Sequence, residues 1–473
     1  MRSFSSRPRS GRFRADPFSS SSSSFRGTGT TADKQGCTQY PWNTTDGSRW
    51  VDEEGSIFDG RSARCLARCV NRGYVTGCHS ATFQWHLISS FYDFLPWSRC
   101  GVAVANEPWS GHYEITAPLW VLAHTTQFAK PGWRYTAHGS GVDMLGLGGS
   151  VVTRVSPDGA DFSVVIEKMT TEHSACARGS NPSVTIATEP VQLVLKGGLL
   201  AAAKSKGLHL WRSNLTSGDA EGVNPPDSAL FQLITAPSIG ADGSVTINVC
   251  AEEIYTLTTL ATGHKGVAAK RPPASAPFPL PFTQNFDDEA SSAPPAIWYD
   301  QMGAWQVQPK ASADGTTHVD ATDMVMRQVS PVWPACWGYS CSGPLTYFGP
   351  QKFNCSRGFK MTLDVMMEAA QDATFLLSAK GMGVQIDSAT GAWNFTGTGH
   401  STQGGSSSFR KGQWHTLYVG INTTHIVAAL DGNMLGTGAN KGKEGFYVQM
   451  GLDKYVYADV DNWSVAEGDL MDF

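Results

Sequence analysis

Two adjacent carboxylates, Glu53 and Glu54, follow a strand-like stretch over residues 48–52 and lead into a Gly-Ser turn that ends at Ser56. In a (β/α) barrel the carboxyl ends of the strands carry the chemistry. A retaining glycosidase needs one ionised Asp or Glu at such a place to attack the anomeric carbon. Acidic runs are also typical of solvated loops, because carboxylates are mostly exposed. The stretch therefore predicts either a nucleophile or a solvated acidic loop.

The residues after this stretch predict a helix and a second strand. An apolar residue recurs every fourth position over 83–95, Ser80 is a plausible N-cap, and Pro96 follows, so we expect a helix over residues 80–95. The small, continuously apolar run Gly101–Ala105 is typical of a strand buried on both faces of a parallel sheet. It leads into Asn106-Glu107-Pro108-Trp109, which would lie at the same edge as Glu53.

The rest of the chain predicts two β domains. Residues 132–263 read as a β-sandwich, in which the strands 150–155 and 162–166 flank the turn Pro157-Asp158-Gly159. Residues 264–282 are a Pro-rich, stiff linker, and residues 283–473 form a second all-β domain with strands at 359–367, 374–377, 383–387, 414–420 and 426–430. Residues 1–35 are rich in Ser and Arg and lack the apolar core of a signal peptide. They are a disordered leader, a transit-like segment or a wrongly joined first exon, of which we favour the last.

Length and composition restrict the function. A chain of 473 residues suggests about three domains, and its net charge of -5 gives no electrostatic reason to expect a nucleic-acid partner. The 15 Trp and 50 Gly residues favour a β-rich protein that handles carbohydrate. No apolar run of about 18 residues is present, so we expect no transmembrane segment.

Cysteines and glycosylation sequons indicate an oxidising compartment. The 10 cysteines are scattered and do not form paired CxxC units, which favours disulfides over a zinc site. His112 and His124 lie at no metal-ligand spacing, and we expect them to be hydrogen-bonded structural residues. Acceptor patterns for N-glycosylation begin at Asn43, Asn214, Asn354, Asn394, Asn422 and Asn462.

One long stretch resembles a known family. The similar residues are Arg99-Cys100-Gly101, Glu107 to Tyr113, Trp120, His124 to Phe128 and Pro131-Gly132-Trp133. The stretch is similar to the galactosylceramidases, which are lysosomal β-galactosidases acting on galactosyl sphingolipids. The resemblance extends from about residue 40 to the C-terminus. It implies the last strands of a (β/α)8 TIM barrel over residues 36–131, the β-sandwich over 132–263, and a lectin-like jelly roll over 283–473.

The resemblance also assigns site residues. Glu53 falls on the nucleophile of the family, and Glu54 stands where the family has Asp. Ser56 and Arg178 correspond to residues that bind galactose hydroxyls, and Trp337 to a tryptophan that the lectin domain extends over the sugar. Trp97 stands where the family usually has a pocket tyrosine, so one hydroxyl is lost.

A disulfide and a calcium site are implied in the same way. Cys176 corresponds to a cysteine that pairs with the one matched by Cys65, which would hold Arg178 near the site, although Cys69 is an alternative partner. Calcium positions of the lectin domain fall on Asn285, Asp287, Asp461 and the main-chain oxygen of Met324. Asn285 replaces an acid, and ordinary turn carboxylates are the alternative interpretation. No cofactor is expected for catalysis.

The general acid/base of the family, a Glu preceded by Asn at the end of the fourth barrel strand, has no counterpart, and Glu107 lies too late in the chain to supply it. We therefore expect an N-terminally truncated galactosylceramidase that is itself inactive and unstable. A non-catalytic galactoside- or glycolipid-binding remnant is the alternative function. The resemblance implies a galactosphingolipid substrate, a saposin-like lipid activator and a lysosomal or secreted location, although no signal peptide is visible.

Overall fold

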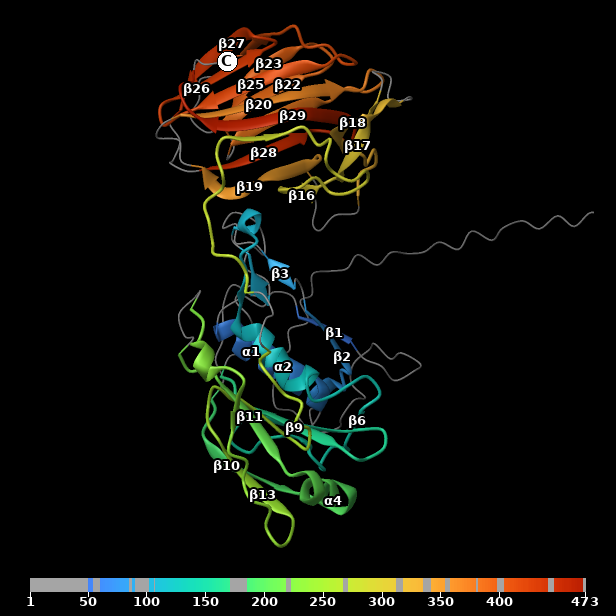
Figure 1. Cartoon of the computed structure of the whole chain (residues 1–473), viewed down its shortest axis with the longest axis vertical. Coiled ribbons are helices and arrows are strands. Elements are labelled where there is room, and N and C mark those ends of the chain that lie inside the picture. Colours follow the sequence, from blue (N-terminus) through green and yellow to red (C-terminus); the bar gives the residue numbers. More distant parts are fainter. Residues whose placement is uncertain are drawn as a thin grey trace, which may run out of the picture.

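The computed structural model describes residues 50–53, 60–84, 87–89, 102–105, 107–170, 185–217, 223–266, 271–311, 318–334, 342–353, 358–379, 382–397, 404–440 and 446–470. These residues build a multidomain, mostly β structure with few helices. Figure 1 shows a β-sandwich from the C-terminal part at one end of the long axis and a second group of strands toward the other end. The helices α1 and α2 lie against this second group.

The N-terminal region contains short parallel strand pairs. Its elements are β1 (Trp50–Glu53), α1 (Gly60–Gly77), β2 (Ala81–Gln84), β3 (Ile88–Ser89), β4 (Ala103–Val104), η2 (Pro108–Ser110), β5 (Glu114–Ile115) and α2 (Ala117–Thr126). β1 pairs in parallel with β2, and β3 pairs in parallel with β4. Barrel strands pair in this way, but the described residues do not form a barrel, so the partial barrel stays a prediction.

The helix predicted over residues 80–95 is wrong where the structure describes it. Residues 81–84 form β2 and residues 88–89 form β3, while Leu87, expected on the buried face, is 70% exposed. Pairing of β2 with β1 outweighs the helical spacing of the apolar residues. The helix of this region is α1 instead, which the sequence analysis missed. The strands predicted at 48–52 and 101–105 are confirmed in part by β1 and β4.

The central region is a sheet with α1 and α2 on one face and a separate pair of strands and a further helix on the other. Its elements are β6 (Arg134–Tyr135), β7 (Val142–Met144), β8 (Ser150–Val155), β9 (Phe162–Glu167), β10 (Glu189–Val194), α4 (Gly197–Lys206), β11 (His209–Asn214), η3 (Asp227–Ala229), β12 (Gln232–Ile234), β13 (Ser244–Val249) and β14 (Glu253–Thr258). The sheet order is β12-β11-β14-β9-β8-β6, and β10 pairs separately with β13. The predicted hairpin of β8 and β9 is confirmed, and Gly159 in its turn has a φ of 69° that favours glycine.

Both faces of the central sheet are covered, which explains why buried and exposed residues do not alternate along its strands. Every residue of β9 and β14 is buried, because both faces of the sheet are covered. On one face, Phe162, Val164 and Ile166 join a core with residues of β10, β13 and α4. On the other face, Val165 and Ile254 pack against apolar residues of α1 and α2.

The C-terminal region is a two-sheet sandwich. Its elements are β15 (Phe282–Gln284), β16 (Trp298–Met302), β17 (Trp305–Ala311), β18 (His318–Gln328), β19 (Leu345–Phe353), β20 (Phe359–Met367), β21 (Thr374–Ala379), β22 (Met382–Asp387), β23 (Ala392–Thr396), β24 (Gly404–Ser406), β25 (His415–Ile421), β26 (His425–Leu430), β27 (Asn433–Ala439), β28 (Phe446–Leu452) and β29 (Ala458–Glu467). One sheet, here called the front sheet, runs β17-β18-β29-β20-β25-β26-β27, and the other runs β16-β19-β28-β21-β22-β23-β24. The five strands predicted here from sequence correspond to β20, β21, β22, β25 and β26 and are confirmed.

Strand alternation produces the core of this sandwich. In β20 the residues Phe359, Met361 and Leu363 are fully buried between the sheets, whereas Lys360 and Thr362 are on the outer face. Trp305, Trp463 and Phe375 are among the largest buried side chains of the same core. Burial of this many aromatic and aliphatic side chains is the main stabilising contribution to the sandwich.

Buried polar side chains fix α1 on the central sheet. Arg64 is 4% exposed, and its Nη2 donates to the carbonyl oxygen of Leu215 at 2.5 Å. Its Nε lies 3.0 Å from Oε2 of Glu252. One turn later, Nη1 of Arg68 donates to the carbonyl oxygen of Met169 at 2.9 Å. We call Arg64, Arg68 and their acceptors the arginine clamp, because it joins α1 to three separate segments of the central region.

Loss of the clamp is expected to destabilise the central region. The substitution Arg64→Met keeps an apolar stem but leaves Glu252 and the carbonyl of Leu215 buried without their partner, which costs about 3–5 kcal/mol. Urea unfolding followed by far-UV circular dichroism measures this change in the free energy of unfolding. Lys204→Met, on the exposed face of α4, is the control and should change it by less than about 0.5 kcal/mol. Equal effects of the two substitutions would contradict the clamp.

Candidate active site and lectin-like sandwich

The structure places the predicted nucleophile at a strand end. Glu53 is the last residue of β1 and is opposite Gln84 of β2 in a parallel register. This is the carboxyl end of a parallel pair, the position at which the sequence analysis expected it. The next described element is the clamped helix α1, which begins at Gly60.

Most of the other predicted site residues cannot be compared with the structure. Ser56, Trp97, Arg178 and Trp337 lie outside the described residues, as do Glu54 and Cys176. Their roles in binding galactose, and the disulfide between Cys65 and Cys176, stay predictions. Cys65 itself is on α1 and is 2% exposed. Cys78, just after α1, is disulfide-bonded, which agrees with the expected oxidising compartment.

His124 is a buried, fully hydrogen-bonded residue of α2, as the sequence analysis expected. Its Nδ1 is 2.9 Å from Oγ1 of Thr256, and its Nε2 is 2.8 Å from Oγ of Ser213. The Thr256 hydroxyl donates to the main-chain oxygen of His124, and the Ser213 oxygen accepts from the N–H of Phe231. Both hydroxyls are therefore satisfied if the imidazole is neutral with its proton on Nδ1. Burial lowers the pKa of His124 to about 3.

The Glu-Pro-Trp motif fastens the Pro-rich linker. Nε1 of Trp109 donates to the main-chain oxygen of Ala276 at 2.7 Å, and the Trp109 ring meets Phe278 edge to face at 5.4 Å. His112 Nδ1 is 2.8 Å from the main-chain oxygen of Pro273, which confirms its predicted structural role. The main-chain oxygen of Glu107 accepts from the N–H and the hydroxyl of Ser110, so Glu107 begins a tight turn. This motif therefore positions the linker.

The residues predicted to bind calcium lie in the C-terminal sandwich, and one of them, Asp461, contacts a lysine. Oδ1 of Asp287 accepts from the N–H of Met324 at 2.9 Å, and Oδ2 accepts from the side-chain amide of Asn285 at 2.6 Å. Asp461 is buried, and its Oδ2 accepts from Nζ of Lys310 at 3.0 Å. The sequence analysis did not single out Lys310, since it is adjacent to none of these residues in the chain.

Charge at this cluster is set by the buried acid and the lysine. Burial raises the pKa of Asp461, and the hydrogen bond from Lys310 opposes this effect. Burial works against the charge of Lys310, but its hydrogen bonds to Asp461 and Asp323 outweigh this, so the pKa of Lys310 is raised. Within the described residues no group of three or more His, Cys, Asp or Glu side chains is disposed to hold a metal ion.

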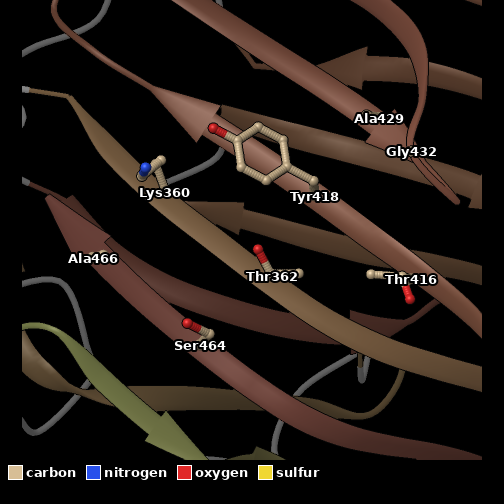
Figure 2. A pocket seen from close by; sticks show the side chains of 8 residues that line it. All are labelled: Lys360, Thr362, Thr416, Tyr418, Ala429, Gly432, Ser464 and Ala466. Carbon is tan, nitrogen blue, oxygen red and sulfur yellow. The ribbon is translucent and has the colours of Figure 1, made fainter. Parts of the chain in front are cut away.

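A cavity of about 300 Å³ lies on the outer face of the front sheet (Figure 2). Its lining comes from β20, β25, β26 and β29 and the turn after β26, and consists of Lys360, Thr362, Thr416, Tyr418, Ala429, Gly432, Ser464 and Ala466. The Tyr418 hydroxyl donates to the main-chain oxygen of Leu470 at 2.7 Å. Hydroxyl and ammonium groups are suited to sugar hydroxyls. We call this cavity the front-sheet groove.

Comparison with known protein families agrees with the resemblance seen in the sequence. Glycosyl hydrolase family 59 matches residues 25–127, the central domain of that family matches residues 137–264, and the C-terminal lectin domain of galactocerebrosidase matches residues 300–468. These successive matches cover most of the chain in the order of one family. The chain therefore belongs to glycosyl hydrolase family 59.

Individual relatives are similar over most of this chain. The galactocerebrosidase of Salmo salar is 32% identical over 436 residues, which are 88% of this chain and 62% of that protein. The galactocerebrosidase of Homo sapiens is 30% identical over 437 residues, which are 88% of this chain and 60% of that protein. The chain thus spans about three fifths of the length of these relatives. The solved structure of galectin LEC-6 from Caenorhabditis elegans matches with a TM-score of 0.21 and 16% identity, and covers 24% of this chain and 86% of that chain.

The buried His124 predicts acid sensitivity. The unfolded chain takes up a proton near the ordinary pKa of 6.5, whereas the folded protein resists protonation down to about 3, so stability falls as the pH drops below 6.5. At pH 5 the loss from this group is about 2 kcal/mol. Urea unfolding of the wild type and of His124→Gln at pH 7 and pH 5 measures it. The wild type should lose about 2 kcal/mol more than the variant between these pH values, and equal losses would contradict the assignment.

Proposed function

We propose that this protein is a retaining β-galactosidase of the galactosylceramidase type, which hydrolyses the galactosyl bond of galactosylceramide or a related galactosphingolipid. The observation that carries this proposal is Glu53 at the carboxyl end of β1, within the residues that match the family. Names of the relatives support the substrate class, since they are called galactocerebrosidases.

Glu53 is the nucleophile in this proposal. Its carboxylate attacks the anomeric carbon of galactose, the bond to the lipid oxygen breaks, and a covalent galactosyl-Glu53 intermediate forms that water then hydrolyses. The lipid oxygen needs a proton as it leaves, and a retaining enzyme has an acid carboxyl about 5 to 5.5 Å from the nucleophile for this purpose. We assign that acid to no residue of this chain. Glu107 is not a candidate, because it comes after the nucleophile in the chain, in the place of the Glu-Pro-Trp motif of the family.

The remaining predicted residues complete the proposal. Ser56 and Arg178 donate to the galactose hydroxyls, Trp97 and Trp337 contact the sugar ring, and a Cys65–Cys176 disulfide holds Arg178 in place. A saposin-like activator would present the lipid, and the family relationship favours a lysosomal or secreted glycoprotein. Among the helices of the described residues, none is both long and apolar enough to cross a membrane.

A substrate with a good leaving group tests the nucleophile without an acid. The inactivity expected from the sequence follows from the missing acid, which a galactolipid substrate needs. 2,4-Dinitrophenyl β-galactoside needs no protonation of its leaving group, so the purified chain should turn over this substrate and should be labelled on Glu53 by 2-deoxy-2-fluoro-galactosyl fluoride, detected by peptide mass spectrometry. Glu53→Gly should lower turnover by at least about 10³-fold. Added azide should restore turnover and yield α-galactosyl azide, because azide occupies the space of the lost carboxylate.

Glu107→Gln is the matched control for this experiment and should retain wild-type turnover of the dinitrophenyl galactoside. A wild-type chain that neither turns over this substrate nor becomes labelled would contradict the enzyme proposal. Labelling at a carboxylate other than Glu53 would contradict the assignment of the nucleophile only.

Binding of a galactolipid without hydrolysis is the second candidate function, and the front-sheet groove favours it. The groove presents Lys360, Thr362 and Ser464 on one polar face of a sandwich that matches a lectin domain. Figure 2 shows Lys360 and Thr362 on the same strand, with Ser464 on the neighbouring strand. Such side chains are able to donate to and accept from the hydroxyls of a galactose headgroup.

Flotation with lipid vesicles tests this second function. The chain should bind vesicles containing galactosylceramide and not vesicles of phosphatidylcholine alone. The double substitution Lys360→Ala and Thr362→Val should weaken binding about tenfold, because each lost hydrogen bond contributes about 0.5–1.5 kcal/mol. Lys454→Ala, an exposed lysine outside the groove, is the control. Unchanged binding by the double variant would exclude the groove as the site.

A further inference from the structure

We propose that the ammonium group of Lys310 takes the place that the family resemblance gives to a calcium ion, so that the C-terminal sandwich is stabilised by an internal cation and does not require calcium. This inference is independent of the proposed enzymatic function. It concerns the cluster formed by Lys310, Asp323 and Asp461, with Asp287 and Asn285 beside it.

A bulge in the front sheet brings the lysine to this position. β17 pairs with β18 in regular register up to Pro309, which is opposite Met324, but the next residue, Lys310, is opposite Asp320. The residues between Asp320 and Met324 therefore form a bulge on β18, and Asp323 lies in it. As a result, Nζ of Lys310 is 3.0 Å from a carboxylate oxygen of Asp323 and 3.0 Å from one of Asp461.

An aromatic ring holds the same ammonium group. Nζ of Lys310 lies 4.7 Å from the centre of the Trp414 ring, just before β25. A ring face attracts a cation at this distance. Three groups from separate segments of the sandwich thus converge on one ammonium, which is how a bound cation ties strands together.

The carboxylate that most needs a counter-charge already has one. The Asp461 side chain is only 4% exposed, so it is costly to bury unless it is paired, and Lys310 pairs with it. Asp323 is 40% exposed and Asp287 is exposed, so water solvates both. A calcium ion added to these oxygens would gain little from Asp461 and would be repelled by the nearby ammonium.

The other predicted ligands also face N–H donors. Asp287 accepts one hydrogen bond on each carboxylate oxygen, from the N–H of Met324 and from the amide of Asn285. The second oxygen of Asp461 accepts from the N–H of Asn462 at 2.7 Å. A hard cation needs several oxygen ligands that face it together. The donor set as it stands fits an ammonium with hydrogen-bonded carboxylates better than it fits calcium.

Calcium sensitivity of wild type and variants tests this proposal. Differential scanning calorimetry of the full chain should show the same midpoint for the C-terminal sandwich in EDTA and in millimolar calcium chloride. Lys310→Met keeps the stem near Trp414 but removes the charge, and it should lower this midpoint by about 5 °C in EDTA. Calcium should restore much of the loss in this variant, because the vacated oxygens then accept a divalent cation.

Controls and a second readout keep the test decisive. Lys310→Arg retains the charge and should stay insensitive to calcium, and Lys411→Met, which removes an exposed pair with Asp372, should show neither the loss nor the rescue. Terbium, a luminescent substitute for calcium, should be sensitised by excitation of Trp414 in Lys310→Met and not in the wild type. A wild-type midpoint that rises with calcium, terbium binding to the wild type, or a Lys310→Met variant that calcium does not stabilise would each overturn the proposal.

Discussion

The desolvated arginine clamp is the interaction on which the N-terminal half of the structure depends. Arg64 and Arg68 are 4% and 7% exposed, and their donors reach main-chain oxygens of Leu215, Thr216 and Met169. An apolar helix face could slide on a sheet at small cost, whereas a buried guanidinium is satisfied in one register only. The clamp therefore fixes where α1 lies on the central sheet.

A row of aromatic contacts connects the Glu-Pro-Trp motif, through the linker, to the C-terminal sandwich. Trp109 contacts Phe278 of the linker, Phe278 contacts Phe348 of β19, and Phe348 contacts Trp463 of β29, with centroid distances of 5.4, 5.2 and 5.1 Å. Together with the hydrogen bonds of Trp109 and His112 to Ala276 and Pro273, these contacts hold the linker between the Glu-Pro-Trp motif and the C-terminal sandwich. The matched domains, which follow one another in the chain, are thus also physically connected.

Sequence reasoning succeeded where one physical effect dominates. The strands β20 and β25 were predicted, and residues of both pack in the core, while the turn at Gly159 predicted its hairpin. It failed where tertiary contacts determine the local structure. The apolar spacing over 80–95 favours a helix, but β2 pairs with β1, and α1 was missed because arginines are expected to be exposed. Lys310 was missed because only the bulge in β18 brings it to Asp461.

Three buried acids of the described residues are paired with cations of the same chain. Glu252 pairs with Arg64 in the central region, and in the C-terminal sandwich Asp459 pairs with Arg327 while Asp461 pairs with Lys310. Asp459 and Asp461 point to the same side of β29, since they are two residues apart on one strand. A cation from within the chain is always present at the site, whereas a bound ion depends on its concentration in the surroundings. With these two neighbouring pairs on β29, the strand pairing of the front sheet depends on residues of the chain and not on a bound ion.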